Sequence, residues 1–481
     1  MYIREPEREI IVLDQVDVLV AGAGVSGCAA AMAAARTGAR TLLVERAGAL
    51  GGVATMGLMA NIGNLFMDQQ GRFVIEGIAR EVVQRLVMRG AASDKWASPE
   101  VPGCVIDSEQ LRVLLIEMLR EAGVTVLTHV LATRPVLAET STPQQRVVQG
   151  AFVETKVGRQ AILAKQLVDT TGEADLASQA GAPMQWATGT ASLEFKMARV
   201  DLEALYQHFR QRPETFPVGM DHVKGFAEFE RNWVERGIFF FPHGGGRKWD
   251  LIQRAIEQGE FERDRGIFHG LDAAGLYGLK GQDSVIVNAN FWDITSLKAP
   301  ELSAAELGAQ EICYYVADFF RRQIPGFARA YIVQLASDLG VRTSRAIEGA
   351  ATLTSGHLTS PHPVYFDDVI GCAPARTRFV ESGHFVHAHT FDIPYGLMVP
   401  KEVENLLVAS GKSAPTEPHG LVRGMSNCMV LGQAAGTAAA LAAAQDVIPR
   451  KLDIRLLQRT LVEQGAFLGN AERLQALKID A

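Results

Sequence analysis

Three glycines near the amino end stand in a pattern that can bind a nucleotide, Gly22-Ala-Gly24-Val-Ser26-Gly27. Between a strand and a helix, glycines at this spacing permit a tight turn, a close backbone approach to a pyrophosphate, and close packing of the helix on the strand. The positive end of the helix then faces the phosphates. The string alone also occurs by chance, so its meaning depends on its surroundings.

An acid and a second glycine pair follow at informative distances. Glu45 lies 18 residues after Gly27, close to the offset of about 20 residues at which an acid binds a ribose 2′-hydroxyl. A carboxylate there disfavours a 2′-phosphate. Gly51 and Gly52 favour FAD over NAD, because glycine amides at that point let the backbone reach the pyrophosphate and the ribityl chain. An ordinary Gly-Gly turn is the alternative.

The elements needed to position these residues are present in the pattern of the chain. Residues 16–21 have the pattern of a buried parallel strand, the alanine-rich run 29–35 predicts a helix that ends at Gly38, and residues 41–45 predict the next strand. Together they form a complete βαβ unit, and the glycine turn connects its first strand to its helix.

Further elements continue this alternation of strands and helices. The pattern predicts helices over 75–87 and 107–119, a strand at 124–127, a hairpin of 147–156 with 161–169, a helix over 304–323, a strand at 405–410 and a helix over 425–444. From about Gly181 the chain is rich in aromatic residues, which indicates an inserted domain. We therefore expect residues 1–180 and 339–481 to form one nucleotide-binding domain, and residues 181–338 an α+β substrate or cap domain.

The composition of the whole chain favours a small-molecule partner. Its 481 residues exceed the size at which a single hydrophobic core stops growing. The 47 basic and 54 acidic residues leave no dense basic run for nucleic acid or an anionic membrane. Acids and glycines interrupt the apolar stretch 10–35, so we expect no membrane span there, and no signal-like segment precedes it, which favours a cytoplasmic enzyme. The spacing of the cysteines and histidines predicts neither disulfides nor a metal site.

Taken in order, the motifs of this chain resemble those of the FAD-dependent oxidoreductases of the two-dinucleotide-binding-domain flavoprotein superfamily. The motifs are the turn at 22–27, Glu45-Arg46 with Gly51-Gly52-Val-Ala-Thr55, Val168-Asp169-Thr-Thr171-Gly172, Leu339-Gly-Val-Arg342-Thr-Ser-Arg345, Ile393-Pro-Tyr395-Gly, Asn405-Leu-Leu-Val-Ala-Ser410-Gly411 and Gly432-Gln-Ala-Ala-Gly436. The resemblance implies an α/β fold with a Rossmann-like FAD-binding domain of glutathione-reductase type, and FAD as the cofactor.

The resemblance also implies a place for each motif along the cofactor. The residues concerned are Gly22, Gly24, Ser26 and Gly27 at the pyrophosphate, Glu45 and Arg46 at the adenosine ribose, Gly51, Gly52 and Thr55 along the ribityl chain and flavin, Val130 at the adenine edge, Thr171 and Gly172 over the adenosine side, and Gly411 at the ribityl chain. Asp169 is open to two interpretations, a cofactor contact or an acid that binds backbone groups at its strand end.

The helix predicted after Gly424 has Met425, Ser426 and Asn427 in its first turn. Its positive end would face the flavin N1–C2=O edge, where negative charge builds up on reduction. Such a placement would raise the electron affinity of the flavin. The small residues further along this helix also suit close packing, and both interpretations can hold together.

Chemistry on a substrate needs a group that exchanges a proton near neutral pH, and histidine is the natural candidate. His389 and His419 are the preferred histidines because they lie near segments that resemble the flavin-facing strand and helix. Arg423 adjoins the same helix and offers a donor fork for a carboxylate or for the charge of the reduced flavin. For each of the three residues a structural role is the alternative.

The expected function is oxidation of a small organic substrate, or reduction of a double bond, by hydride transfer at flavin N5. Oxygen, a quinone or a carrier protein would then reset the flavin, and the oligomeric state is left open. One alternative is an NAD-dependent Rossmann dehydrogenase, which Gly51-Gly52 and the returning carboxyl-terminal segment disfavour. A non-catalytic or RNA-modifying flavoprotein is the other, and the acidic charge balance disfavours RNA.

Overall fold

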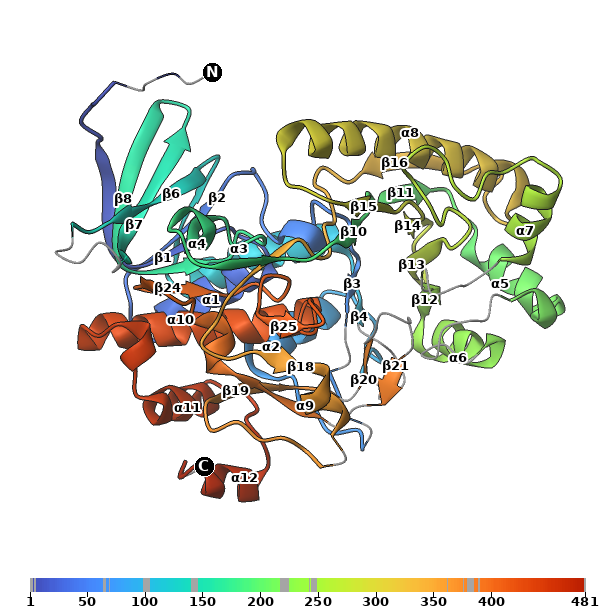
Figure 1. Ribbon diagram of the computed structural model, residues 1–481. Coiled ribbons are helices and arrows are strands. Elements are labelled where there is room, and N and C mark those ends of the chain that lie inside the picture. The colour runs from blue at the N-terminus through green and yellow to red at the C-terminus, as the bar shows by residue number, and fades with distance from the viewer. Residues whose placement is uncertain are drawn as a thin grey trace.

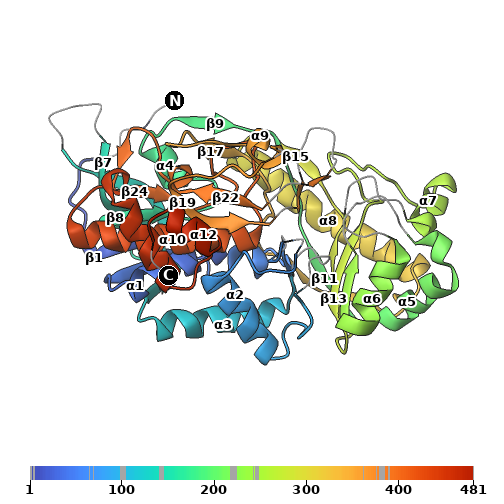
Figure 2. The same ribbon diagram turned by 90° about the horizontal axis from the view of Figure 1, so that it is seen from below.

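The chain forms two bodies that lie side by side, one built from both ends of the chain and one from its middle (Figure 1). Seen from below, the inserted body stays beside the first (Figure 2). The computed structural model describes residues 3, 6–63, 66–68, 70–97, 104–139, 146–216, 225–241, 243, 249–360, 362–374, 376–378, 385–387 and 390–479.

A sheet of eight strands forms the centre of the first body. Its path runs through β23 (Val403–Glu404), β7 (Arg146–Thr155), β8 (Gly158–Asp169), β1 (Val12–Ala21), β2 (Thr41–Glu45) and β5 (Thr125–Thr128), while β24 (Leu406–Val408) also pairs with β8 and β6 (Leu131–Leu137) with β7. β1 pairs in parallel with β2 and β8, and the last three residues of β8 pair in parallel with β24. A strand from the carboxyl end therefore completes the sheet beside the amino-terminal turn.

The two faces of this sheet bury different neighbours, because side chains alternate along a strand. Val18 and Val20 of β1 face a core shared with the helices, and Leu19 and Ala21 face the opposite core. The helices and 3-10 turns of the first body are α1 (Val25–Arg36), η1 (Gly52–Ala54), α2 (Gly77–Met88), α3 (Ser108–Glu121), α4 (Asp175–Gln179), α9 (Ser355–Thr359), η3 (Tyr395–Met398), α10 (Met425–Gln445), η4 (Pro449–Lys451), α11 (Ile454–Glu463) and α12 (Ala471–Ala476).

Helices α1 and α10, from opposite ends of the chain, pack backbone against backbone. A Cβ added to Gly432 would lie 2.2 Å from the carbonyl oxygen of Ser26, and one added to Gly436 would lie 2.0 Å from that of Ala30. Only glycine fits at these two positions. Among the described helices, α10 alone is long and apolar enough to cross a membrane, but 78% of its most apolar window is buried inside the protein.

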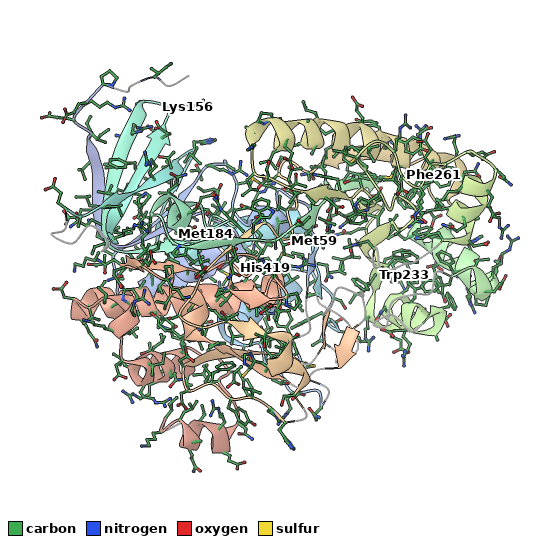
Figure 3. The ribbon with its side chains drawn as sticks, viewed as in Figure 1. Met59, Lys156, Met184, Trp233, Phe261 and His419 are labelled. Atoms are coloured by element: carbon green, nitrogen blue, oxygen red, sulfur yellow. The ribbon has the colours of Figure 1, made fainter. Side chains whose placement is uncertain are left out.

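The inserted body has a core of its own around a five-stranded antiparallel sheet. Its strands, in spatial order, are β12 (Ile238–Phe241), β13 (Gly275–Leu279), β14 (Ser284–Asn288), β11 (Phe195–Ala198) and β16 (Tyr331–Leu335). Its helices and 3-10 turn are α5 (Leu202–Gln211), η2 (Pro213–Thr215), α6 (Phe226–Arg236), α7 (Asp250–Glu257) and α8 (Ala299–Gln323). Buried aromatic rings such as Trp233 and Phe261 fill its core (Figure 3).

Short two-stranded ladders connect and border the bodies. They pair β3 (Asn61–Ile62) with β4 (Cys104–Val105), β9 (Met184–Trp186) with β17 (Arg345–Ile347), β10 (Gly189–Ala191) with β15 (Trp292–Ile294), β18 (Leu353–Thr354) with β25 (Thr416–Glu417), β19 (Val369–Ala373) with β22 (Phe391–Pro394), and β20 (Arg376–Arg378) with β21 (Phe385–His387).

The α/β architecture expected from the sequence is confirmed, and the predicted elements match the observed ones closely. α8 begins five residues earlier than expected, at Ala299 rather than at 304, because Pro300 occupies the first turn, where a missing N–H is no loss. The domain boundaries at 180 and 338 stay a prediction.

Candidate active site

The glycine turn at 22–27 leaves the start of α1 open. Gly24 is the N-cap residue, no side chain caps this helix, and its first turn carries no acid. A Cβ on Gly27 would lie 1.8 Å from the carbonyl oxygen of Gly22, whereas a Cβ on Gly24 would meet no atom within 4 Å. Gly27 is therefore required for packing, and Gly24 borders open space at the positive end of a helix, which fits a bound phosphate.

Glu45, at the end of β2, holds the glycine turn in place. Its carboxylate accepts hydrogen bonds from the backbone N–H of Ala23 at 2.7 Å and of Ala47 at 2.9 Å. Each carboxylate oxygen has a second lone pair, so Glu45 keeps acceptor capacity for a ribose hydroxyl. Val130 lies beside Glu45, since its N–H donates to the Glu45 carbonyl oxygen at 2.9 Å.

The side chain of Arg46 reaches the segment in which the chain returns from the inserted body to the first body. Its guanidinium pairs with Asp338 at 2.5 Å. This ion pair links the nucleotide-binding body to the inserted body. The contacts of Glu45, Arg46 and Val130 with the adenosine stay predictions.

The second glycine pair lies directly against the first turn. The N–H of Gly51 donates to the carbonyl oxygen of Ala23 at 2.8 Å, and a Cβ on Gly52 would lie 3.0 Å from the Cα of Gly24. The hydroxyl of Thr55, which is fully buried, donates to the carbonyl oxygen of Leu50 at 2.5 Å and closes the loop. Gly24, Gly51 and Gly52 therefore lie against one another, and Gly24 and Gly52 are partly exposed.

The carboxyl-terminal segment closes on the same turn. The hydroxyl of Ser26 donates to the carbonyl oxygen of Ala409, and the N–H of Ala409 donates to the carbonyl oxygen of Asp169 at 3.0 Å. A Cβ on Gly411 would lie 2.1 Å from the carbonyl oxygen of Val422, so this loop folds tightly back on the chain before α10. The Ser26 hydroxyl is thus used within the protein.

Thr171 and Gly172 lie next to this carboxyl-terminal loop. The carbonyl oxygen of Gly172 accepts hydrogen bonds from the hydroxyls of Ser410, at 2.8 Å, and Ser413. Asp169 accepts from the backbone N–H and the hydroxyl of Thr171, at 3.1 and 2.7 Å, and from the N–H of Ala177. These bonds support the structural interpretation of Asp169.

The start of α10 is also uncapped. Gly424 is its N-cap residue, with no side-chain cap and no acid in the first turn. Met425 and Ser426 are buried, and the Ser426 hydroxyl donates to the carbonyl oxygen of Gly63 at 2.9 Å. Asn427 is fully buried, yet neither polar atom of its amide has a hydrogen-bond partner among the described residues. A buried amide without a partner is rare, and a ligand that bonds to Asn427 would satisfy it.

The starts of α1 and α10 are offset along the axis of the packed helix pair. Gly432 lies level with Ser26, and α10 begins seven residues before Gly432, whereas α1 begins one residue before Ser26. The six-residue difference places the start of α10 about 9 Å beyond that of α1 at 1.5 Å per residue. One helix start can therefore face a pyrophosphate while the other faces the distal end of the same elongated ligand. The arrangement fits FAD.

The predicted catalytic residues are only partly described. His389 lies outside the described residues. His419 is half-buried, and burial lowers the pKa of its ring below the ordinary value of 6.5. Arg423 is exposed one residue before the N-cap of α10. Among the described residues no group of three metal-ligating side chains comes together.

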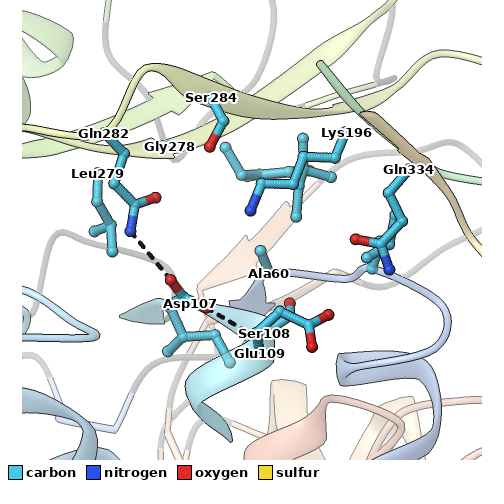
Figure 4. A pocket seen from close by; sticks show the side chains of 14 residues that line it. Ala60, Asp107, Ser108, Glu109, Lys196, Gly278, Leu279, Gln282, Ser284 and Gln334 are labelled. Carbon is cyan, nitrogen blue, oxygen red and sulfur yellow. Dashed lines mark hydrogen bonds between the residues drawn. The ribbon is translucent and has the colours of Figure 1, made fainter. Parts of the chain in front are cut away.

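A small pocket, with a cavity volume of about 20 Å³, lies where the inserted sheet meets the first body. Figure 4 shows Lys196, Ser284 and Gln334 reaching in from the sheet, opposite Ala60 and the start of α3. Sequence reasoning missed this polar wall. The alternation of residues 194–198 shows that every second side chain shares a face, but it does not show which face meets the other body.

Comparison with known proteins identifies the family of this chain. The family model described as FAD dependent oxidoreductase matches residues 17–461. A geranylgeranyl bacteriochlorophyll reductase-like protein from Thermoplasma acidophilum is 14% identical with a TM-score of 0.41, over 94% of this chain and 87% of that one. The p-nitrophenol 4-monooxygenase PnpA from Pseudomonas putida is 10% identical with a TM-score of 0.43, over 94% and 84%. Thermovibrio ammonificans THI4 is 25% identical with a TM-score of 0.26, over 34% of this chain and 61% of that chain. No curated protein matches the chain.

Proposed function

Because this chain belongs to the FAD-dependent oxidoreductases, as the match over residues 17–461 shows, we propose that it transfers a hydride between a small organic substrate and N5 of the flavin. FAD, when bound, supplies the acceptor or donor of the hydride. The residues described above bind and orient it. A family match to FAD-dependent enzymes removes the support for the alternative NAD-dependent dehydrogenase.

The observation that carries this proposal is that two uncapped helix starts, those of α1 and α10, lie at the same end of one packed helix pair. The start of α1, with Gly24 beside open space, suits the pyrophosphate. A positive helix end at α10 favours negative charge on the isoalloxazine, which promotes acceptance of a hydride. Lys196 and Gln334 offer polar groups to a small molecule at the junction of the two bodies.

Two measurements on the purified protein test the proposal. We expect a yellow protein with flavin absorption, and we expect anaerobic addition of a suitable small alcohol, hydroxy acid or amine to bleach that absorption. Readmission of oxygen, or addition of a quinone, then identifies the group that accepts the electrons. A chain that carries FAD but is bleached only by NADH or NADPH, and by no small organic donor, would refute oxidation of such donors.

A further inference from the structure

A buried acid stands on the face of the inserted sheet that meets the cofactor loop. Lys196 of β11 lines the junction pocket, and Glu194, two residues earlier, shares its face because strand side chains alternate. Lys196 is paired with Ile286 of β14, so Glu194 stands opposite Asn288. Phe195, between the two polar residues, points into the core of the inserted body.

The contacts of Glu194 are incomplete. Its side chain is 5% exposed, and one carboxyl oxygen accepts a hydrogen bond from the Asn288 amide at 2.8 Å. The other oxygen, Oε2, and the Oδ1 of the fully buried Asn288 have no hydrogen-bond partner among the described residues. Two unpartnered polar atoms on a hydrogen-bonded pair of buried side chains indicate a ligand that bonds to this pair.

Burial also decides the ionisation of this acid. Loss of hydration raises the pKa of the Glu194 carboxyl well above its ordinary value of 4.5, and the charge of Arg342 and the bond from Asn288 offset only part of this effect. Glu194 therefore holds a proton under conditions in which an exposed glutamate has lost it. A carboxyl group with a raised pKa is a better proton acceptor when ionised than an exposed glutamate, and it holds its proton for donation when neutral.

Backbone bonds place Glu194 beside the cofactor loop. The carbonyl oxygen of Glu194 accepts from the N–H of Ala336 at 2.9 Å, and the next residue, Ser337, donates to the carbonyl oxygen of Met56 at 2.9 Å. Met56 directly follows Thr55, which ends the loop that begins at Gly51. Glu228 is a buried acid on α6, at the end of the inserted body that lies away from α1 (Figure 1).

We propose that Glu194, oriented by Asn288, is the acid–base residue of this enzyme, and that the substrate presents a hydroxyl or carbonyl oxygen to these two side chains. This proposal rests on the proposed hydride transfer. In the oxidative direction the substrate C–H bond breaks and its hydrogen leaves with both electrons to FAD, which is reduced. The O–H bond breaks as well, its proton passes to Oε2 of the ionised Glu194 carboxylate, and the C–O single bond becomes a carbonyl. In the reductive direction the protonated Glu194 returns that proton to oxygen as carbon receives the hydride.

Glu194→Gln separates this role from a structural one without any substrate. An acid whose pKa is raised by folding contributes stability below its unfolded value of 4.5 that is lost as pH rises through its folded value. The neutral glutamine escapes this loss. We expect the variant to retain its FAD absorption and to melt at a higher temperature than the wild type at neutral pH, with the difference vanishing as pH falls to 4.5. A variant that fails to fold, or melts at a lower temperature at neutral pH, overturns the proposal.

Anaerobic reduction of FAD by a panel of secondary alcohols and 2-hydroxy acids gives the second readout. Loss of the acid should slow reduction roughly 100-fold or more, the usual contribution of a general acid or base. Glu228→Gln is the matched control, and it should leave the rate unchanged. If the FAD of the Glu194→Gln variant is reduced as fast as that of the wild type, the proposed role of Glu194 is wrong, and the proposed hydride transfer is unaffected. A wild type without bound FAD refutes the proposed function instead. If no panel member reduces the wild type, the melting comparison still decides the ionisation on which the role depends.

Discussion

Replacement of Gly432 by alanine tests whether the packing of α10 on α1 shapes the cofactor site. The added Cβ would lie 2.2 Å from the carbonyl oxygen of Ser26 and 3.1 Å from the Cβ of Ala29. An ordinary contact begins near 3.4 Å, so the two helices must separate by about 1 Å at this point. Both neighbours belong to a buried helix, and neither is the flexible end of a long side chain.

Two opposing terms set the size of the effect. Alanine favours a helix over glycine by about 1 kcal/mol. Overpacking of a close-packed contact costs about 1–3 kcal/mol, and backbone atoms on both sides place this site at the upper end. The net expectation is a loss of about 2 kcal/mol in the free energy of unfolding. Because Ser26 lies in the first turn of α1, beside the proposed pyrophosphate site, FAD should also bind more weakly.

The assay compares denaturant midpoints of the FAD-free proteins and the dissociation constants for FAD. Gly308→Ala is the control, since Gly308 also lies inside a helix but meets only the edge of the Phe268 ring, at 3.1 Å. That ring can move by a few tenths of an ångström, so the control should be as stable as the wild type or more stable. A Gly432→Ala protein with wild-type stability and FAD affinity would refute the argument that this contact is fixed.

Three further substitutions give separate expectations. Gly24→Val adds a side chain where no atom lies within 4 Å, so the FAD-free protein should keep its melting temperature. Its affinity for FAD should fall at least about tenfold, or 1.4 kcal/mol. Equal affinity of variant and wild type in a titration would contradict the phosphate site. Asn427→Leu removes a buried amide without a partner among the described residues and should stabilise the FAD-free protein by about 1 kcal/mol. In the FAD-bound protein the flavin absorption spectrum or reduction potential should shift. A destabilised FAD-free protein would show that the amide has a structural role. His419 has a lowered pKa, so the wild type should lose stability as pH falls below 6.5. In denaturation measured at several pH values, the free energy of unfolding of His419→Gln should depend less on pH. Identical curves for the variant and the wild type would argue against a buried, neutral ring.

The nucleotide-binding half was predictable because its signals are local. Gly22, Gly24 and Gly27 fall between a buried strand and an alanine-rich helix, and Glu45 ends the next strand. One nucleotide-binding motif, a strand, a glycine turn, a helix and a second strand with a terminal acid, explains all four positions. The observed contacts between Gly24, Gly51 and Gly52 agree with it. The α/β fold and the cofactor class followed from these motifs.

The substrate side was not predictable for the opposite reason. Glu194 and Asn288 lie far apart in the sequence, and each stands in an apolar strand pattern where its face cannot be assigned. Only the register of β11 with β14 and the bond from Ser337 to Met56 bring this pair beside the cofactor loop. The histidines were favoured because their ordinary pKa is near neutral, whereas tertiary burial can give a glutamate the same property.

The bond between the Ser26 hydroxyl and the Ala409 carbonyl oxygen has a consequence for biogenesis. These residues are 383 positions apart, so at ordinary ribosomal speed the second emerges roughly 20 to 80 s after the first. Throughout that interval the alanine face of α1 lacks the helix that covers it in the finished enzyme. The nascent polypeptide thus lacks the carboxyl-terminal part of the proposed cofactor site while it is being made. A premature stop before Gly411 should leave a colourless, aggregation-prone fragment that depends on chaperones.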